Sequence, residues 1–202
     1  MRAHDRRSSR RLTLVKPPRP RASAPPPARG VAGRLDALRA RLALWRCAAI
    51  GEGVQVRGRV WIHGGGEVVL GDRVVLDGGE VGVELHAEPH GTIVIGDGVV
   101  LKAGASVEAE ELVIIGDRCE LGRFSRVMDN HFHPVDGDRH QRPASQPVRL
   151  GEGVVLGDRA VVLPGAELGD GVRLAADTVV GRKVRAGQHL AGVPPRQERR
   201  IS

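Results

Sequence analysis

The sequence predicts an all-β fold, a parallel β-helix of six-residue repeats preceded by a short helix and a basic tail. Bulky aliphatic residues recur every six positions through the C-terminal half of the chain. Aromatic residues make up only 2% of the 202 residues, and glycine reaches 28. A chain of this length fits one domain of about 100–150 residues with flanking segments. This composition requires an aliphatic core that is interrupted by many turns.

The repeat is clearest over one uninterrupted run, in which a small or β-branched residue follows each large aliphatic residue four positions later. The large residues are Leu150, Leu156, Val162, Leu168, Leu174 and Val180, and those that follow them are Val154, Ala160, Ala166, Val172, Thr178 and Val184. The same frame appears earlier at Leu70, Leu76, Ile95, Leu101, Val107, Ile115, Leu121 and Val127. A fixed period of this kind is typical of a solenoid.

A six-residue period matches neither a helix nor simple strand alternation, but it matches one short strand followed by one tight turn. Each hexapeptide is then one side of a triangular prism, and three of them make a coil of eighteen residues. The aliphatic residue points inward and stacks on its counterpart about 4.8 Å away. Pairs such as Gly71-Asp72 and Gly157-Asp158 follow it at the corners, where tight or left-handed backbone is needed.

The segments before the repeat differ from it in composition. Residues 1–30 are rich in Arg, Pro, Ala and Ser, which predicts a disordered tail. This tail is either simply solvated or an arm for anionic glycans, nucleic acid or a membrane. Residues 31–50 are expected to form an amphipathic helix that caps the prism or lies on a membrane surface. Its apolar stripe consists of Leu35, Leu38, Leu42 and Trp45.

Charge and cysteine content limit the classes of function. The net charge is +7, but the excess lies mainly in the first thirty residues, where Asp5 is the only acid. We therefore expect no nucleic-acid partner for the repeat domain. Cys47 and Cys119 form no CxxC pair, and Cys119 occupies a core position of the repeat. No long apolar run or secretion signal follows the basic N-terminus, which predicts a cytoplasmic location.

The repeat frame is lost between Val127 and Leu150. We expect the β-helix to span residues 51–190, with an active-site loop at 128–147 and a C-terminal tail at 191–202. A long insertion at a prism corner is a candidate for function. The loop contains three histidines, and an imidazole with a pKa near ~6.5 can accept a proton from a hydroxyl group. A lone loop histidine is nevertheless more often an ordinary surface residue.

The sequence resembles the hexapeptide-repeat O-acetyltransferases, a group that includes galactoside, maltose and xenobiotic acetyltransferases and enzymes that modify surface polysaccharides. The resemblance covers roughly residues 54–195. It rests on an Asp-x-x-Phe-His-Pro element at 129–134, on the segments 146–151 and 162–165, and on Leu-Ala-Gly-Val-Pro at 190–194. The resemblance implies a left-handed β-helix and a homotrimer packed through the prism faces.

The resemblance also implies transfer of an acetyl group from acetyl-CoA to a hydroxyl group of a sugar or glycan. His133 matches the catalytic base of the family, and Asp129 would orient its imidazole or help to hold the acceptor. His131 is the alternative base and a candidate acceptor contact. Lys102 is a second candidate contact, because it stands where the family often has an acceptor-binding Asn.

The family binds CoA in a groove between adjacent prisms, towards their C-terminal end. The corresponding region here implies donor contacts from Gly157 and Ala175, and phosphate contacts from Arg182, Lys183 and Arg196. Asp177 places a negative charge in this region, and Val155 replaces a tryptophan that is common beside the active loop of the family.

Two other functions remain open from the sequence. The chain could be a non-catalytic hexapeptide scaffold or binding module, which failure to bind CoA would favour. It could also be a metalloenzyme like the γ-class carbonic anhydrases, with His86 and His90 joined by His131 or His133 as zinc ligands. The O-acetyltransferase interpretation requires no metal.

Overall fold

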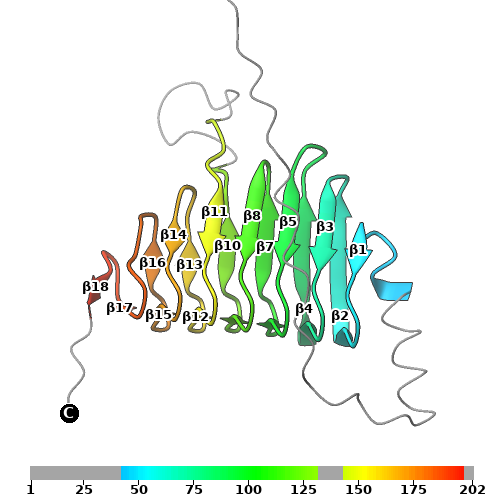
Figure 1. The fold of residues 1–202 in the computed structure, drawn as a ribbon, viewed down its shortest axis with the longest axis horizontal. Helices are drawn as coiled ribbons and strands as arrows, with labels where there is room; N and C mark the ends of the chain where they lie inside the picture. Colours follow the sequence, from blue (N-terminus) through cyan, green and yellow to red (C-terminus); the bar gives the residue numbers. More distant parts are fainter. Residues whose placement is uncertain (1–41, 132–142, 198–202) are drawn as a thin grey trace, which may run out of the picture.

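The computed structural model describes residues 42–131 and 143–197, which form a parallel β-solenoid (Figure 1). The short strands stack side by side along one axis, from β1 at one end to β18 at the other. The predicted all-β fold with a parallel β-helix is therefore confirmed. The predicted tail at 1–30, the first part of the predicted helix and residues 198–202 lie outside the described residues.

Three faces make up the solenoid, and each is a parallel sheet. Face A consists of β1 (Ala49–Ile50), β3 (Glu67–Leu70), β5 (Thr92–Ile95), β8 (Leu112–Ile115), β11 (Val148–Leu150) and β14 (Glu167–Leu168). Face B consists of β6 (Val100–Leu101), β9 (Glu120–Leu121), β12 (Val155–Leu156), β15 (Arg173–Leu174) and β17 (His189–Ala191). Face C consists of β7 (Ser106–Ala109), β10 (Arg126–Met128), β13 (Val161–Val162) and β16 (Val179–Val180).

Two long strands, β2 (Gln55–Gly64) and β4 (Val75–Ala87), turn the corner between faces B and C. The first part of β4 pairs with β6 and its last part with β7. At the C-terminal end, β18 (Arg196–Gln197) pairs antiparallel with β17, through Ala191 and Arg196. Strand structure therefore continues past the predicted domain end at residue 190.

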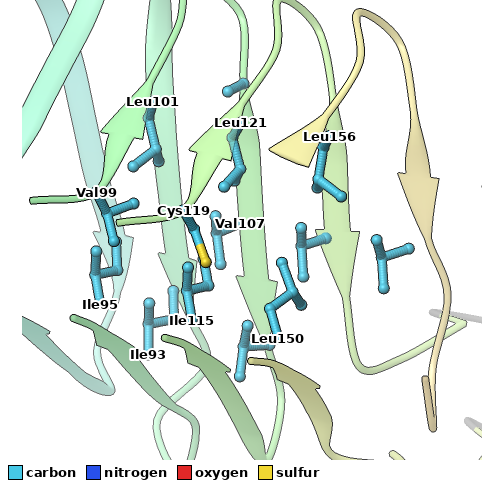
Figure 2. Packing of buried hydrophobic residues seen from close by; sticks show 14 of the residues in the cluster. Ile93, Ile95, Val99, Leu101, Val107, Ile115, Cys119, Leu121, Leu150 and Leu156 are labelled. Atoms are coloured by element: carbon cyan, nitrogen blue, oxygen red, sulfur yellow. The ribbon is translucent and has the colours of Figure 1, made fainter. Parts of the chain in front are cut away.

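The repeat frame correctly predicts which residues point inward. Leu150 pairs with Leu168, Leu156 with Leu174 and Val162 with Val180, so successive coils in this region are eighteen residues apart. Every large repeat residue is buried, and so is every residue four positions after one in the run that begins at Leu150. Figure 2 shows equivalent residues, such as Leu101, Leu121 and Leu156, stacked in a row along the interior. The core is thus a set of aliphatic columns.

Cys119 lies in this core, as predicted, and its exposed fraction is 1%. Its Sγ–H donates a hydrogen bond of 3.0 Å to the carbonyl oxygen of Gly151 in the next coil. Burial raises the pKa of the thiol to about 11, and it raises that of Cys47 equally. Both cysteines are free thiols, and both are in the protonated, unreactive form at neutral pH.

The corner residues differ in part from the prediction. The left-handed position is the third residue after the aliphatic one, and it is occupied by Gly98 and Gly153 in some coils but by Arg73 and Arg118 in others. The glycine of each Gly-Asp pair instead allows close stacking of coils. A Cβ added at Gly96 would lie 2.8 Å from the backbone nitrogen of Asp117. Absence of a side chain therefore matters there more than backbone freedom.

The aspartates of these pairs connect the coils. Asp97 Oδ1 accepts a hydrogen bond from the Asp72 N–H at 2.8 Å, and Asp117 Oδ1 accepts one from the Asp97 N–H at 2.9 Å. Asp170 Oδ1 does the same for the N–H of Glu152. Each carboxylate thus satisfies a corner N–H group that strand pairing leaves free.

Gly151 and Gly153 allow the two roles of corner glycine to be separated. We expect Gly151→Ala to destabilise the protein by about 1–3 kcal/mol or more, because the new Cβ would lie 2.7 Å from the Asp170 backbone nitrogen. Gly153 has a φ of 64°, in the left-handed region, and no atom lies within 4 Å of an added Cβ. Gly153→Ala should therefore cost only about 1–2 kcal/mol of left-handed strain. Urea unfolding of both variants measures the difference, and a larger effect at Gly153 would contradict it.

The N-terminal end of the solenoid differs from the predicted helix over 31–50. Leu42 and Ala43 are helical, but Ala49 and Ile50 form β1 and pair with Val69 and Leu70 of β3. A strand at this place covers the edge of β3, which would otherwise expose unpaired backbone groups. Among the described residues, no helix is long and apolar enough to cross a membrane.

Leu44, which is not in the predicted apolar stripe, closes the core at the N-terminal end of the solenoid. Leu44 is completely buried, whereas the exposed fractions of Leu42 and Trp45 are 68% and 74%. The predicted stripe is therefore wrong for the two of its members that the structure describes. Leu44 follows a different spacing because the chain leaves the helical conformation directly after Ala43.

Candidate active site

The loop that interrupts the repeat lies at the corner between faces C and A. Strand β10 ends at Met128 on face C, and β11 begins at Val148 on face A. Residues 132–142, which include His133, lie outside the described residues. The base of the loop, residues 129–131 and 143–147, is described. It shows how the two ends of the loop are attached to the solenoid.

Asp129 and Gln146 join the two ends of the loop. The Gln146 N–H donates a hydrogen bond of 2.8 Å to the carbonyl oxygen of Asp129. The carbonyl oxygen of Gln146 in turn accepts one of 3.0 Å from the Gly165 N–H in the following coil. The loop therefore begins and ends at a fixed point of the corner.

The side chain of Asp129 is completely buried and binds the preceding coil. Its Oδ1 accepts a hydrogen bond from the Glu110 N–H at 2.8 Å, and its Oδ2 accepts bonds from the Glu111 and Leu112 N–H groups at 2.8 and 2.7 Å. Asn130 Nδ2 also donates to Oδ1, at 3.2 Å. We call this arrangement of Asp129, Gln146 and the 110–112 turn the loop clasp.

The predicted catalytic and acceptor-binding residues of the loop are only partly described. His131 is exposed immediately after the clasp. The role of His133 as base stays a prediction, and so does a direct part for Asp129 in the reaction. Of the contacts of the Asp129 carboxylate described above, three are with backbone N–H groups and one is with the Asn130 side-chain amide.

Charge changes sign along the corner that carries the loop. Glu110 and Glu111 lie on its N-terminal side, where Ser145 Oγ donates a hydrogen bond of 3.1 Å to Glu111 Oε2. Arg182 and Lys183 are exposed at the same corner in the last coil. The loop thus separates an acidic side from a basic side.

A groove with a volume of about 650 Å³ runs over the C-terminal part of face A. It is basic, since Arg149, Lys183 and Arg185 line it and Glu167 is its acidic residue. Lys183 Nζ lies 2.9 Å from Glu167 Oε2. Arg149 lies on β11, the strand by which the loop rejoins the solenoid, so the groove begins directly beside the loop.

Sequence reasoning missed Arg149 and Arg185, although a signal was present for Arg149. Arg149 pairs with Glu167, eighteen residues later, so these two residues share a column on the outer side of face A. In the last coil Leu168 pairs with Val184, so Lys183 rather than Arg185 follows Glu167 in this column. Extending the repeat analysis from the inward positions to the outward ones would have grouped Arg149 with Glu167.

The five predicted donor contacts do not converge on one place within the chain. Lys183 lines the groove on face A, whereas Gly157 and Ala175 stack on each other at the corner between faces B and C. Arg182 Nη2 donates a long hydrogen bond of 3.5 Å to the Pro195 carbonyl, which places it beside Arg196 at the C-terminal end.

Lys102 also lies at the corner between faces B and C, where it forms an ion pair with Glu120. Asp177 belongs to the same corner and is bound by Arg159 through two hydrogen bonds of 2.7 and 2.8 Å. The Arg159 guanidinium holds the pKa of the Asp177 carboxyl below its usual range and has its own pKa raised. The negative charge of Asp177 is therefore balanced. Arg159 and Asp177 are eighteen residues apart, which is one coil, so the repeat spacing could have revealed this pair.

The histidines of the zinc alternative have other partners. The ring of His86 stacks on that of His63 with a centroid distance of 4.3 Å, and its Nε2 lies 4.0 Å from Glu88 Oε1. His90 is exposed in the following turn. Within residues 42–131 and 143–197, no group of three or more His, Cys, Asp or Glu side chains has the arrangement of a metal site.

Comparison with known proteins places the chain among proteins with this repeat. Residues 147–182 match the family described as "Bacterial transferase hexapeptide (six repeats)". Over 152 residues, the chain is 28% identical to WbbJ of Escherichia coli K12, which is named a lipopolysaccharide biosynthesis O-acetyl transferase. This match covers 69% of this chain and 74% of WbbJ.

Solved structures share the fold at lower identity. AntD, an N-acyltransferase from Bacillus cereus in complex with dTDP and coenzyme A, has a TM-score of 0.66 at 17% identity, over 80% of this chain and 88% of that one. Galactoside acetyltransferase with coenzyme A has a TM-score of 0.55 at 20% identity, over 81% of this chain and 70% of that one. The polysialic acid O-acetyltransferase OatWY has a TM-score of 0.58 at 18% identity, over 74% of this chain and 80% of that one.

The family match covers the run of repeats that the sequence analysis singled out, together with the strand by which the loop rejoins it. The solved structures extend the likeness of the fold to about four fifths of the chain. Residues 147–182 thus match the bacterial transferase hexapeptide repeat, and the resemblance to the hexapeptide-repeat acetyltransferases is confirmed.

Proposed function

We propose that this protein transfers an acetyl group from acetyl-CoA to a hydroxyl group of a sugar or glycan. The observation that carries the proposal is the position of the clasped loop directly beside the basic groove of face A. The similarity to WbbJ, named for O-acetyl transfer in lipopolysaccharide biosynthesis, supports a glycan acceptor. Two of the structural neighbours contain coenzyme A, which supports this donor.

The groove has the chemistry that the donor needs. Coenzyme A is polyanionic because of its phosphate groups, and Arg and Lys are the side chains that bind phosphate oxygens best. Arg149 and Lys183 lie on either side of Glu167 in the same column, and Arg185 adds a third cation to the groove. We infer that the phosphates of acetyl-CoA bind here, with the thioester directed towards the loop.

The reaction requires a base and a fixed geometry. His133 would take the proton of the acceptor hydroxyl group while the oxygen of that hydroxyl group attacks the thioester carbonyl carbon. When the tetrahedral intermediate collapses, the C–S bond breaks, the thiolate of CoA takes the proton from the imidazolium, and an acetyl ester remains on the sugar. The loop clasp would hold the ends of the loop in place during these steps.

A homotrimer would bring the divided site residues together. Lys102, Gly157 and Ala175 lie at the corner between faces B and C, whereas the loop lies at the corner between faces C and A. Contact between these two corners of neighbouring copies would complete one site per interface. We therefore propose a trimer with three such sites, and a cytoplasmic location where acetyl-CoA is available.

Charge reversal in the groove tests the donor site. Arg149→Glu and Arg185→Glu should each raise the KM for acetyl-CoA about tenfold, which corresponds to about 1.4 kcal/mol, with little change in kcat. Arg57, an exposed arginine on β2 at the other end of the solenoid, is the matched control. Arg57→Glu should leave the KM unchanged, and equal effects of all three variants would contradict the assignment.

The activity itself is tested with a panel of galactosides, maltose, lipopolysaccharide core oligosaccharides and amino sugars, by following release of the CoA thiol. Mass spectrometry then locates the acetyl group on the product. Failure to bind acetyl-CoA and to acetylate any acceptor would favour the non-catalytic scaffold. Transfer to amines alone would contradict O-acetylation.

A further inference from the structure

We propose that the outer side of β2 and β4 on face C binds the acceptor sugar, with Trp61 as its stacking platform. This inference rests on the proposed function and assigns the acceptor side of the same site. Four exposed or half-exposed side chains form the surface, which we call the Trp61 patch: Trp61, His63, Glu84 and His86. None of these residues is among those that the sequence analysis assigned to the acceptor.

Strand pairing places these side chains in a regular grid. Trp61 is paired with Glu84, and His63 with His86. Their neighbours in the strands, Ile62 and Leu85, are buried, so the four side chains of the patch all point outward. Paired residues on adjacent strands are about 4.8 Å apart. The patch is thus a compact surface of one indole, two imidazoles and one carboxylate.

Trp61 is large and exposed but firmly supported. Its exposed fraction is 49%. A Cβ added at Gly82 would lie 3.1 Å from both Cε3 and Cζ3 of the indole, so the six-membered ring packs against the Gly82 backbone. A supported aromatic ring with a free side is suited to stack on the apolar face of a pyranose. Because the fold already fixes the position of the indole ring, binding of a sugar loses little side-chain entropy.

Fixed hydrogen-bonding groups lie beside the indole. His63 Nε2 is 2.8 Å from Glu84 Oε1, and the His63 and His86 rings are stacked. Ser106 Oγ lies 3.4 Å from Glu84 Oε2 and donates a hydrogen bond of 3.0 Å to Glu108 Oε1. Ser106 and Glu108 are themselves buried, so the hydroxyl group that contacts Glu84 is held in place by the fold. Carboxylate and imidazole groups in fixed positions match the donors and acceptors of sugar hydroxyls.

The charge of the surface favours a neutral sugar. Glu84, Glu88 and Glu108 lie on or next to the patch, and Glu110 and Glu111 follow at the corner. These carboxylates outnumber the two cations that the structure describes nearby, which are Arg126 of β10, opposite Ser106, and Arg46, which lines a hollow together with His63. An anionic sugar would be repelled here, whereas the phosphates of CoA are attracted to the groove on the opposite side of the loop. Donor and acceptor would thus approach the loop from sides of opposite charge.

The Trp61 patch is continuous with the strand from which the loop begins. Glu84 pairs with Ser106 and Ser106 with Arg126, while His86 pairs with Glu108 and Glu108 with Met128. Two strand spacings, about 10 Å, therefore separate β4 from β10. Met128 directly precedes Asp129 of the loop clasp. A sugar stacked on Trp61 of β2 is thus three strand spacings from the strand that leads into the loop.

The two tryptophans of the chain give a direct test. Trp45→Phe leaves Trp61 as the single fluorophore, and Trp61→Phe leaves Trp45, which is also exposed and lines a hollow at the edge of the patch together with His63. Both variants are titrated with maltotriose and chitotriose as neutral probes, and with a sialic acid trimer as the anionic probe. We expect a neutral sugar to change the emission of the Trp45→Phe variant at least twofold more than that of Trp61→Phe, and the sialic acid trimer to change neither.

Kinetics give the second readout. Trp61→Ala should raise the KM for the acceptor about tenfold and leave the KM for acetyl-CoA unchanged, and Trp61→Phe, which keeps an aromatic ring, should raise the acceptor KM less. A Trp61 emission that no sugar changes, or an unaltered acceptor KM in Trp61→Ala, would overturn the inference. Sugar binding at Trp61 without any acetyl transfer would uphold the patch and contradict the proposed function. Absence of both binding and transfer would overturn both.

Discussion

Replacing His133 with alanine is expected to lower kcat for acetyl transfer by about 10²–10⁴-fold, which is the usual contribution of a general base. A sugar hydroxyl is a poor nucleophile at neutral pH, so the reaction depends on removal of its proton as the C–O bond forms. The donor groove on face A is formed by other residues. The affinity for acetyl-CoA, measured by calorimetry, should therefore stay within about twofold of the wild-type value.

His131 provides the matched control, because it is exposed two positions earlier in the same loop. His131→Ala should keep activity within a few-fold of wild type. The wild-type kcat/KM should also fall at acidic pH, since a protonated imidazole cannot act as a base. Undiminished turnover in His133→Ala, or a larger loss in His131→Ala, would refute the assignment of His133.

The sequence predicted the interior of the solenoid well because one physical rule governs it. Each coil must fill the same triangular space, so inward residues repeat at fixed spacing, as Leu156 and Leu174 do. The corners follow no such strict rule. Arg73 adopts the left-handed conformation that Gly98 adopts one coil later, because a single αL residue costs only about 1–2 kcal/mol, which the surrounding coils can offset.

The site was only partly predictable for a related reason. The motif around His133 indicates a catalytic loop, but nothing local shows that Asp129 binds the 110–112 turn of the preceding coil. That contact depends on the register between coils. The same holds for the column of Arg149, Glu167 and Lys183, because Glu167 follows Arg149 by eighteen residues but Lys183 follows Glu167 by only sixteen. The helix predicted to extend to residue 50 failed because edge pairing with β3 outweighs local helical pattern.

Replacing Asp129 with alanine is expected to destabilise the protein by about 3–5 kcal/mol, the second large effect. The carboxylate is completely buried and accepts hydrogen bonds from three backbone N–H groups. Its removal leaves these donors without partners, and an unsatisfied buried group costs about 1–3 kcal/mol. Asp129→Asn keeps one of the two oxygens and should lose less. Urea unfolding measures both, and Asp177→Ala, which removes an exposed ion pair, should leave the urea midpoint nearly unchanged.

The same variants decide between a positioning and a catalytic role for Asp129. If the residue acts by holding the loop clasp, Asp129→Asn should lose stability and activity together, and saturating acetyl-CoA, which binds the folded protein alone, should restore part of the stability. The pH dependence of the remaining activity should keep the wild-type midpoint, because the base is still His133. A variant with wild-type stability and a kcat lowered 100-fold would instead assign Asp129 to the reacting groups. The positions of the three N–H donors, all pointing at one buried carboxylate, favour the first outcome.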